Sequence, residues 1–446
     1  MDRKLVLNNG MTYALLPVLI LIGLVLGIAV LYQPILVVIG VFGAILIILS
    51  FTHPDRISSL IILSTASSIQ FFIHLSLGGL DILSFYKFVI VLLIMPSIIY
   101  YGIKLKFTYP IIALLLLVVI TYFGSDWHMN LTRSAPIKAF IGLAIPFVFL
   151  LVRWKPIAAE RHIRVICFIP LISMIIGVFL HFAGIQPLYL VEFTGAFRMQ
   201  GASIPPHLAM LAYLGVLIAL IEVKRNPKHA MFFYVMVLLN FAILLSTGTR
   251  GPLIASTALL LYYLYDQIKE YFNGKLIRII PLGGFLVLTV ISSILMWANV
   301  KKRSFERTDE TGIDLSGRSE AWDFFLKGVE NSPWFGRGLG SSIVANDGSI
   351  YAGFVVPHNE YIRFYFDTGI IGAVILFLSL FMIFYRVYRV LDVGIKPYYI
   401  GFIIGFLVYS FSDNTLSTLQ FTLPFCWYLG ALHTVSLSKF AKKEVI

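Results

Sequence analysis

The chain has 446 residues, of which 59% are hydrophobic and only 13% are charged, whereas soluble domains carry about 25% charged residues. Together with a mean hydropathy of +0.91, this composition excludes a soluble globular enzyme and predicts a polytopic membrane protein. A net charge of +12 would suggest a nucleic-acid partner for a soluble protein. Here we attribute the charge to membrane orientation and expect no nucleic-acid partner. The two cysteines, Cys167 and Cys426, fall inside apolar stretches and define neither a disulfide framework nor a thiolate metal site.

Apolar runs divide the chain into membrane-spanning helices along its whole length. The run at residues 11–32 is too long for a cleavable signal peptide, and another span follows almost at once. Since a membrane helix needs roughly 20 apolar residues, we predict an all-α fold, a polytopic bundle of about 14 transmembrane helices within a range of roughly 12 to 14. Residues 1–446 are expected to form a single integral-membrane domain. The predicted spans are 12–32, 34–51, 57–75, 83–101, 108–124, 137–152, 164–184, 206–223, 230–246, 252–266, 277–297, 360–388, 397–412 and 419–437.

Lysine and arginine alternate between the connections of these spans. Most of the 34 basic residues fall on one side, near both termini and in every second connection. Short loops rich in Lys and Arg stay in the cytoplasm, so we expect both termini to be cytoplasmic. The long polar loop at residues 298–359 is then extracytoplasmic, and the unusual polar segments described next lie on the same outer face.

The first of these segments surrounds Arg198, the basic residue of the connection before the span at 206. Gly201, Pro205 and Pro206 shape the backbone beside it, so its guanidinium is a candidate anion-binding group. The alternative is an interface arginine that extends its charged head group into water.

The second segment is the turn at residues 246–252, where Thr249, Arg250 and Gly251 follow one another. Small hydroxyl residues, backbone N–H groups and an arginine suit a phosphate oxygen, and no acidic residue lies within several positions. The alternative is a simple glycine turn whose arginine faces lipid headgroups.

The long loop contains an amphipathic helix followed by a glycine motif. Residues 318–330 have apolar residues at helical spacing and predict a helix that begins near Arg318. We expect this helix to lie in the membrane interface and to cover a cavity. The alternative is a helix with one apolar face inside a solvated loop. Gly336, Gly338 and Gly340 follow, but without a preceding strand they are no dinucleotide fingerprint. No G-x-x-x-x-G-K-[ST] loop occurs either, so the chain has no ATPase motif of its own.

The most informative segment is Pro357-His358-Asn359-Glu360, at the boundary between the long loop and an apolar helix. Asn359 is a good N-cap for that helix. A histidine just outside the first turn can accept or relay a proton near neutral pH. The alternative is an interfacial histidine that only helps to cap the helix.

Further polar residues surround this segment in the sequence. The simplest role for Glu360 and Asp367 is pairing with Arg363, and residues 411–414, including Asp413, could add polar groups from the last outer connection. The other histidines occur singly, without H-x-x-x-H or H-E-x-x-H spacing. We therefore expect no metal site and no cofactor.

In this order the segments resemble the bacterial O-antigen ligase and polymerase superfamily, whose members are integral-membrane glycosyltransferases. The resemblance extends from residue 198 to residue 372, and the hydropathy profile extends it to most of the chain. The residues that carry it are Arg198, Gly201 and Pro206, then Thr249-Arg250-Gly251, Gly317-Arg318 with Trp322, Pro333 with the three loop glycines, and His358-Asn359 followed by Gly369 and Gly372.

The resemblance implies a metal-independent glycosyltransferase of the bacterial cytoplasmic membrane, active on its outer or periplasmic face. The implied donor is an oligosaccharide linked to undecaprenyl diphosphate, a polyprenyl diphosphate that Arg198 and Arg250 are expected to hold. His358 is expected to activate an acceptor sugar hydroxyl by removing its proton. The lipid bilayer and a chain-length regulator are further implied partners. The supporting residues are Asn359, Arg318, Thr249 and Gly251.

Two activities within the family remain open. We favour a polymerase, which joins lipid-linked glycans during O-antigen, capsule or exopolysaccharide assembly; the alternative is a ligase that attaches the glycan to lipid A core. Outside enzymes, a flippase or transporter for the same glycans should show repeated halves and polar residues at mid-membrane depth, and the sequence shows neither. A membrane sensor or scaffold would leave the outer arginines and His358 dispensable.

Overall fold

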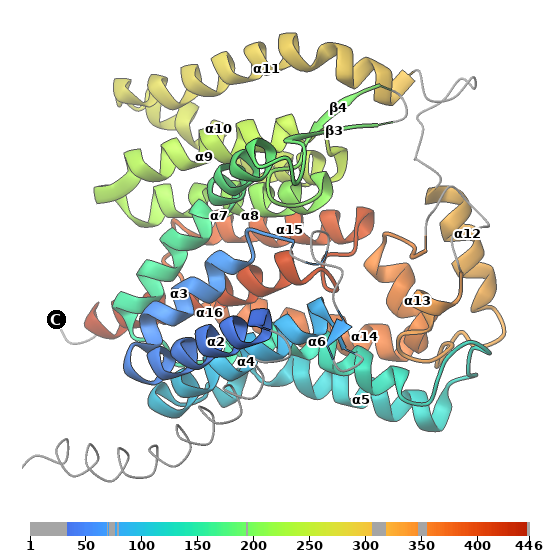
Figure 1. Cartoon of the computed structure of the whole chain (residues 1–446). Coiled ribbons are helices and arrows are strands. Elements are labelled where there is room, and N and C mark those ends of the chain that lie inside the picture. The colour runs from blue at the N-terminus through green and yellow to red at the C-terminus, as the bar shows by residue number, and fades with distance from the viewer. Residues whose placement is uncertain are drawn as a thin grey trace, which may run out of the picture.

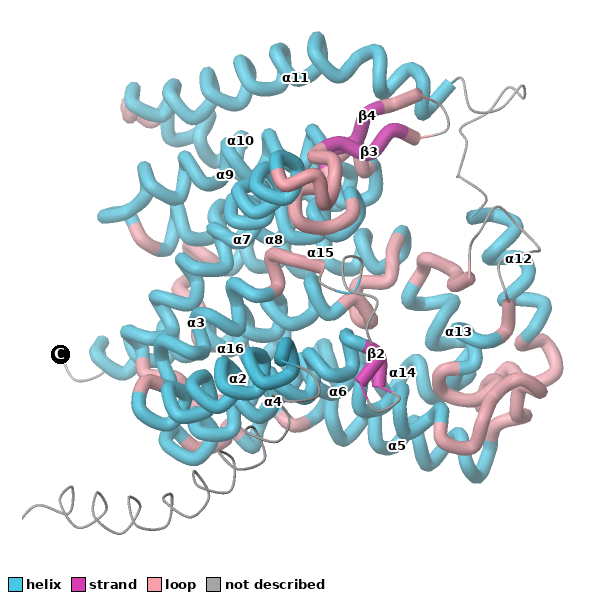
Figure 2. Tube along the Cα trace, viewed as in Figure 1, coloured by secondary structure: helices cyan, strands magenta, loops and turns pink. Residues whose placement is uncertain are grey.

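The computed structural model of the chain describes residues 34–68, 70, 76–77, 80–192, 195–305, 318–346 and 355–443. Helices form nearly all of this part, and they pack in one bundle (Figures 1 and 2). The helices are α2 (Pro34–Thr52), α3 (Pro54–Ser64), α4 (Ile82–Tyr101), η2 (Leu105–Phe107), α5 (Tyr109–Gly124), α6 (Ala135–Leu151), α7 (Pro156–Phe182), α8 (Pro205–Arg225), η3 (Pro227–His229), α9 (Ala230–Ser246), α10 (Arg250–Phe272), η4 (Leu276–Arg278), α11 (Ile279–Phe305), α12 (Arg318–Gly328), α13 (Ser341–Val344), α14 (Glu360–Arg389), α15 (Lys396–Ser412) and α16 (Leu419–Lys443).

Two short antiparallel hairpins interrupt the helices and were not predicted. Strand β1 (Ser76–Leu77) pairs with β2 (Leu80–Asp81), and β3 (Tyr189–Val191) pairs with β4 (Phe197–Met199). The second hairpin forms the connection between α7 and α8, and Arg198 is the middle residue of β4. This hairpin gives the connection a fixed shape, so Arg198 is placed by backbone pairing.

The predicted spans correspond to helices where the structure describes them, with one exception. The span predicted at 12–32 lies outside the described residues. The helix predicted at 57–75 does not continue through residues 65–68, because α3 ends at Ser64 and the chain turns at 65–67; residues 69 and 71–75 lie outside the described residues. The N–H of Ser68 then donates to the carbonyl of Ala202 (3.0 Å). Serine and threonine compete for backbone hydrogen bonds and favour turns, and residues 64–68 are rich in both.

Several helices extend beyond the apolar runs that predicted them. Helix α7 begins at Pro156 although its predicted span begins at 164, and α10 ends at Phe272 although its predicted span ends at 266. The added segments contain Ala, Glu, Arg, Gln and Lys, which are good helix formers whether or not they are apolar. Apolar runs therefore locate the middle of a helix and miss its polar ends.

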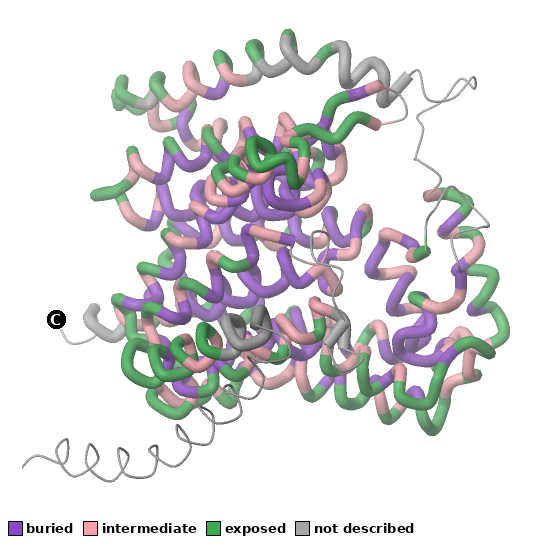
Figure 3. Tube along the Cα trace, in the orientation of Figure 1, coloured by how far each residue is buried: buried purple, intermediate pink, exposed green. Residues whose placement is uncertain are grey.

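The bundle has an apolar exterior as well as an apolar core. Within the described residues, five helices are long and apolar enough to cross a membrane, and several apolar helices are shorter. The five are Ile82–Tyr101, Pro156–Phe182, Pro205–Arg225, Pro227–Ser246 and Glu360–Arg389. Helix α8 is buried at the centre, whereas α2 and α11 at the periphery expose large apolar side chains such as Phe42 and Leu286 (Figure 3). Extended apolar surface of this kind marks contact with a membrane. The number of about 14 spans stays a prediction.

Connections that the basic residues assign to one side also contact one another. The N–H of Asp126 donates to the carbonyl of Gly336 (3.1 Å) at one end of the bundle, which we call the loop end. The loop end contains the described residues of the connections at 125–134, 183–192, 195–204, 247–249, 318–346, 355–359 and 413–418. Lys224 pairs with Asp266 (2.8 Å) at the opposite, basic end, which contains the connections at 102–108, 152–155, 226–229, 273–278 and 390–395. That the basic end faces the cytoplasm stays a prediction from the charges.

Helix α14 joins the two ends and is broken at Gly369, whose φ of 65° and ψ of −174° are non-helical. The glycine-rich loop that follows α12 fills this break. The N–H of Ile370 donates to Pro333 O (2.9 Å), and the N–H of Gly338 donates to Asp367 O (2.8 Å). The loop thereby satisfies backbone groups that the break leaves without helical partners. The first part of α14 is held in a fixed orientation, and His358 precedes it directly.

Candidate functional site

His358 lies at the loop end in a strained backbone conformation. Among the described residues, His358 is the non-glycine residue with a positive φ, which is 47°. Such conformations are uncommon and concentrate at functional sites. The preceding residue is anchored, because Trp322 Nε1 of α12 donates to the carbonyl of Pro357 (2.8 Å). The sequence predicted the helix that carries Trp322, and the structure shows that this helix fixes the histidine segment.

Asn359 caps α14, as the sequence predicts. Its Oδ1 accepts hydrogen bonds from the N–H groups of Tyr361 (3.0 Å) and Ile362 (3.1 Å). These bonds satisfy N–H groups that the first turn of a helix leaves without a partner. Asn359 is 1% exposed, so its role is to fix the start of α14 and the direction in which His358 leaves it.

His358 forms a pair with Asp413, which follows the last residue of α15. The Nδ1 atom of His358 lies 3.2 Å from Asp413 Oδ1 and 3.4 Å from Asn414 Nδ2. The His358 side chain is 30% exposed, whereas that of Asp413 is 9% exposed. A buried carboxylate on one ring nitrogen orients the imidazole and selects the tautomer with its proton on that nitrogen.

The pKa of Asp413 is lower than its ordinary value of 3.8. Burial acts to raise this pKa, but the hydrogen bond and the charge of His358 lower it, as do the N–H of Asn414 and the positive charge of Arg318. Asp413 is therefore ionised at neutral pH. Its contribution to folding stability is present above about pH 4 and is lost as the pH falls through the lowered pKa.

Arg318 brings a cation to the same place from the start of α12. Its charge acts on Asp413 and on the neighbouring Tyr409 of α15. Its Nε atom is buried and has no hydrogen-bond partner among the described residues. A buried guanidinium N–H without a partner is costly, so this arginine is suited to donate to an anionic ligand.

Arg198 is held among protein partners and organises the turn that carries Arg250. Its Nη1 donates to Glu192 Oε1 (2.9 Å), its Nε to the carbonyl of Thr247 (2.9 Å), and its Nη2 to Thr249 Oγ1 (2.7 Å). Arg198 is 8% exposed. The structure thus joins two segments that the sequence singled out separately, and it gives Arg198 a positioning contact that the sequence did not predict.

Gly251 connects this turn to the histidine pair. A Cβ atom added at Gly251 would lie 2.5 Å from Ser412 Oγ and 3.6 Å from Tyr409 Cε2. Helices α10 and α15 therefore touch where Arg250 begins α10 and where Ser412 ends α15, one residue before Asp413. A Cβ atom here would displace the Ser412 hydroxyl, and glycine allows the two helices to approach without that shift.

The carboxylates of α14 bind loops, which corrects part of the expectation that they only pair with Arg363. Glu360 does approach Arg363, with Oε2 at 3.4 Å from Nη1, but its Oε1 also accepts from the N–H of Leu416 (2.6 Å). Asp367 accepts from the N–H groups of Gly340 (3.0 Å) and Ser342 (2.7 Å). The two carboxylates tie the connection at 413–418 and the glycine loop to α14.

The structure thus brings the predicted residues into two adjoining groups at the loop end. His358, Asn359 and Arg318 form one group, and the other comprises Arg198, Thr249, Arg250 and Gly251. Residues 412–413 join them. Sequence reasoning named Asp413 among the polar residues that could join the site but did not predict its pairing with His358, and it missed Glu192 as the partner of Arg198. The available signal was that both are acids in outer connections otherwise poor in charge.

No group of three or more His, Cys, Asp and Glu side chains is placed to hold a metal ion within the described ranges. The positive groups of the site are instead arginines, and the arrangement offers an oriented imidazole beside guanidinium groups. Such a set can accept a proton and hold a phosphate or diphosphate in neighbouring positions.

Fold and site together define a helical membrane protein with a histidine–aspartate pair and arginines at one end of its bundle. Residues 235–377 match the family model described as O-antigen ligase, so this part of the chain is similar to that family. The match begins in α9 and ends in α14, so it includes Arg250, Arg318 and His358. Arg198 and Asp413 lie outside the matched residues, and the packing of the helices brings them to the site. No curated protein matches the chain.

Proposed function

We propose that the protein is a membrane glycosyltransferase that transfers a glycan from undecaprenyl diphosphate to a sugar hydroxyl during surface polysaccharide assembly. The observation that carries the proposal is the contact between His358 and Asp413, next to the turn that carries Arg250. The match of residues 235–377 to the O-antigen ligase family model supports it. In this proposal the loop end faces the outside of a bacterial cytoplasmic membrane, which agrees with the excess of basic residues at the other end.

The proposed reaction uses His358 as general base. With Nδ1 turned to Asp413, Nε2 is the basic nitrogen that accepts the proton of the acceptor hydroxyl. The hydroxyl oxygen forms a bond to the anomeric carbon while the bond from that carbon to the diphosphate oxygen breaks. The bonding electrons leave with the undecaprenyl diphosphate, and configuration at the anomeric carbon is inverted. The carboxylate of Asp413 stabilises the imidazolium that forms.

Arginines stabilise the charge of the leaving group in this proposal. A diphosphate is already a good leaving group, so the protein mainly has to stabilise its negative charge and hold the donor in the orientation that the reaction needs. Arg250 and Arg318 are the candidates for direct contact, while Arg198, bound to Glu192 and Thr249, positions the turn. The arginines supply the positive charge that metal-dependent transferases take from a cation, so we expect activity to persist when EDTA is added.

The Arg250→Ala variant should lose donor handling. Removing one charge-assisted contact to the diphosphate is expected to lower kcat/KM for the lipid-linked donor roughly 10- to 100-fold. The Arg250→Lys variant keeps the charge but not the planar donor pair and should be intermediate. The measurement is initial rate against donor concentration with purified protein in lipid nanodiscs. Arg133→Ala, an exposed arginine of the same end, is the matched control; equal rates for all three variants would remove Arg250 from donor binding.

The Asp413→Asn variant should keep the fold and lose rate. The amide has the size of the carboxylate but cannot stabilise an imidazolium, so kcat is expected to fall at least about tenfold. The KM for the donor should change little, because Asp413 acts through His358. The measurement is kcat and KM at several pH values, with the melting temperature as a check on folding. A rise in KM at unchanged kcat would contradict an orienting role for Asp413.

Within this function we favour a polymerase, whose acceptor is a second lipid-linked glycan, over a ligase, whose acceptor is lipid A core. The deciding experiment is deletion of the gene followed by analysis of surface polysaccharide. Loss of a polymerase leaves single repeat units. Loss of a ligase leaves long lipid-linked chains and bare lipid A core. A lost flippase would instead leave the lipid-linked unit on the cytoplasmic side of the membrane, and that outcome would contradict transferase activity.

A further inference from the structure

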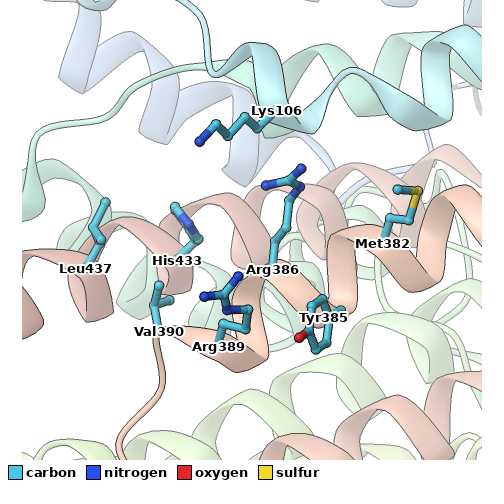
Figure 4. A pocket seen from close by; sticks show the side chains of 8 residues that line it. All are labelled: Lys106, Met382, Tyr385, Arg386, Arg389, Val390, His433 and Leu437. Carbon is cyan, nitrogen blue, oxygen red and sulfur yellow. The ribbon is translucent and has the colours of Figure 1, made fainter.

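A pocket lies at the basic end of the bundle, away from the site just described. It has a volume of about 560 Å³. Helix α14 begins beside His358 and ends in the wall of this pocket, so the two sites are separated by the length of that helix. The lining residues come from η2, α14 and α16 and the residue after α14, and they are Lys106, Met382, Tyr385, Arg386, Arg389, Val390, His433 and Leu437 (Figure 4).

The polar part of this pocket consists of three cations, Lys106, Arg386 and Arg389, and the imidazole of His433. Lys106, Arg386, Arg389 and His433 direct their nitrogen atoms toward one another across the hollow (Figure 4). Among the described residues that line the pocket there is no Asp or Glu. Placing cations together without an acid in the same wall is unfavourable unless a ligand or solvent ion compensates. The pocket therefore has the charge of an anion-binding site.

The partners of these side chains leave hydrogen-bonding capacity toward the pocket. Arg386 donates from Nη2 to the hydroxyl of Tyr109 (2.6 Å) and lies over that ring, and a guanidinium has five N–H donors. The Nδ1 atom of His433 is buried without a partner among the described residues. Buried polar atoms are normally satisfied, so a ligand with several oxygen atoms would complete this wall.

The rim of the pocket is apolar and faces outward. Met382, Tyr385 and Leu437 are 47%, 61% and 46% exposed on α14 and α16. An apolar rim above a cationic floor matches a molecule that has hydrocarbon chains and a phosphate group. Basic pockets between helices on the cytoplasmic side of membrane proteins bind the head groups of anionic lipids in this way. A soluble anion would leave the exposed rim unexplained.

We propose that this pocket binds the phosphate group of an anionic membrane phospholipid, with the acyl chains lying along the rim. The phosphate oxygens accept from Arg386, Arg389 and Lys106, and the lipid occupies the leaflet at the basic end. The simplest alternative is that the two arginines only complement the C-terminal dipole of α14. That role does not require Lys106 and His433, which belong to other elements. It also does not require a hollow between these residues and the arginines.

The test uses the full-length protein in detergent with added phosphatidylglycerol, phosphatidylcholine or inorganic phosphate. Phosphatidylglycerol should raise the melting temperature at concentrations where phosphatidylcholine does not. Since each basic residue near a lipid surface contributes about 1 kcal/mol, the Arg386→Gln/Arg389→Gln variant should bind phosphatidylglycerol about 30-fold more weakly. Native mass spectrometry of retained lipid gives an independent readout. The matched control is Lys228→Gln/Lys269→Gln, which removes two exposed cations of the same end outside the pocket.

Three results would overturn the proposal. One is equal binding of phosphatidylglycerol by the arginine variant and the wild type, and another is an equal loss in the control variant. A third is equal stabilisation by inorganic phosphate, which would make this a site for a free anion. The exposed Arg389 has a single described ring contact, with Tyr385, so we expect Arg389→Gln alone to remain folded. If the double variant does not fold, Arg389→Gln gives the same comparison of lipid binding with the wild type.

Discussion

Replacing His358 should abolish glycan transfer and leave the protein folded. A positioned general base contributes about 10²- to 10⁴-fold to a rate, so we expect kcat to fall by that factor in His358→Ala. The side chain is 30% exposed, and it fills no part of the apolar core. The protein should therefore insert and accumulate normally. The measurement is product formation from a synthetic undecaprenyl-diphosphate glycan, normalised to the amount of protein recovered as a single species by size-exclusion chromatography.

The backbone at this position calls for a second variant. His358 has a φ of 47°, a region in which alanine is strained but asparagine is tolerated. His358→Asn removes the base and keeps the conformation, so loss of activity in both variants separates chemistry from backbone strain. His181→Ala, which removes an exposed histidine from the loop end of α7, serves as control. Wild-type activity in His358→Asn would exclude this residue as the base.

The parts of the site that could be predicted from sequence are those that stand out locally. Arg250 lies in a short polar turn between two apolar runs, and His358 lies at the boundary of a helix with an asparagine cap. Each is recognisable from about ten residues of context. The capping bonds of Asn359 confirm the local prediction, because a cap depends only on the residues that follow it.

The partners of these residues could not be predicted in the same way. His358 and Asp413 are separated by 55 positions, and Arg198 and Thr249 by 51. Which outer connection lies beside which depends on how the helices pack, and apolar runs of similar length and composition do not specify neighbours. The close approach at Gly251 is an example, since its reason is the Ser412 side chain of another helix.

Helix boundaries could be predicted only where a helix begins and ends with its apolar run. The span predicted at 57–75 ends early because residues near Ser68 bond to the segment at 202–207. That contact is tertiary and overrides an apolar run. The break inside α14 was also not predicted, although Gly369 was singled out by spacing. Its cause is a loop from a distant part of the chain that inserts at this point.

The largest effect on structure should come from Gly369→Ala. The backbone there has φ 65° and ψ −174°, a region that is essentially restricted to glycine. A Cβ atom would also lie 2.2 Å from the carbonyl carbon of Trp334 and 2.4 Å from the N atom of Phe335. Both are backbone atoms, so a side-chain rotation cannot relieve the overlap. The glycine loop must move away from α14, and the hydrogen bond from Ile370 N to Pro333 O is lost with it.

This displacement connects the glycine loop to the chemistry. The loop fixes the first part of α14, whose start carries Asn359 and His358, so its release should lower both stability and activity. A strained residue costs about 1–3 kcal/mol before any lost contact is counted, and we expect a lower melting temperature and faster proteolysis within residues 329–346. Gly394→Ala is the matched control, because a Cβ atom there meets nothing within 4 Å. An unchanged melting temperature and protease pattern in Gly369→Ala would show that the loop does not depend on this contact. Glycan transfer is measured on the same samples, and a loss of activity together with the loss of stability is the result expected if the loop holds His358 in place.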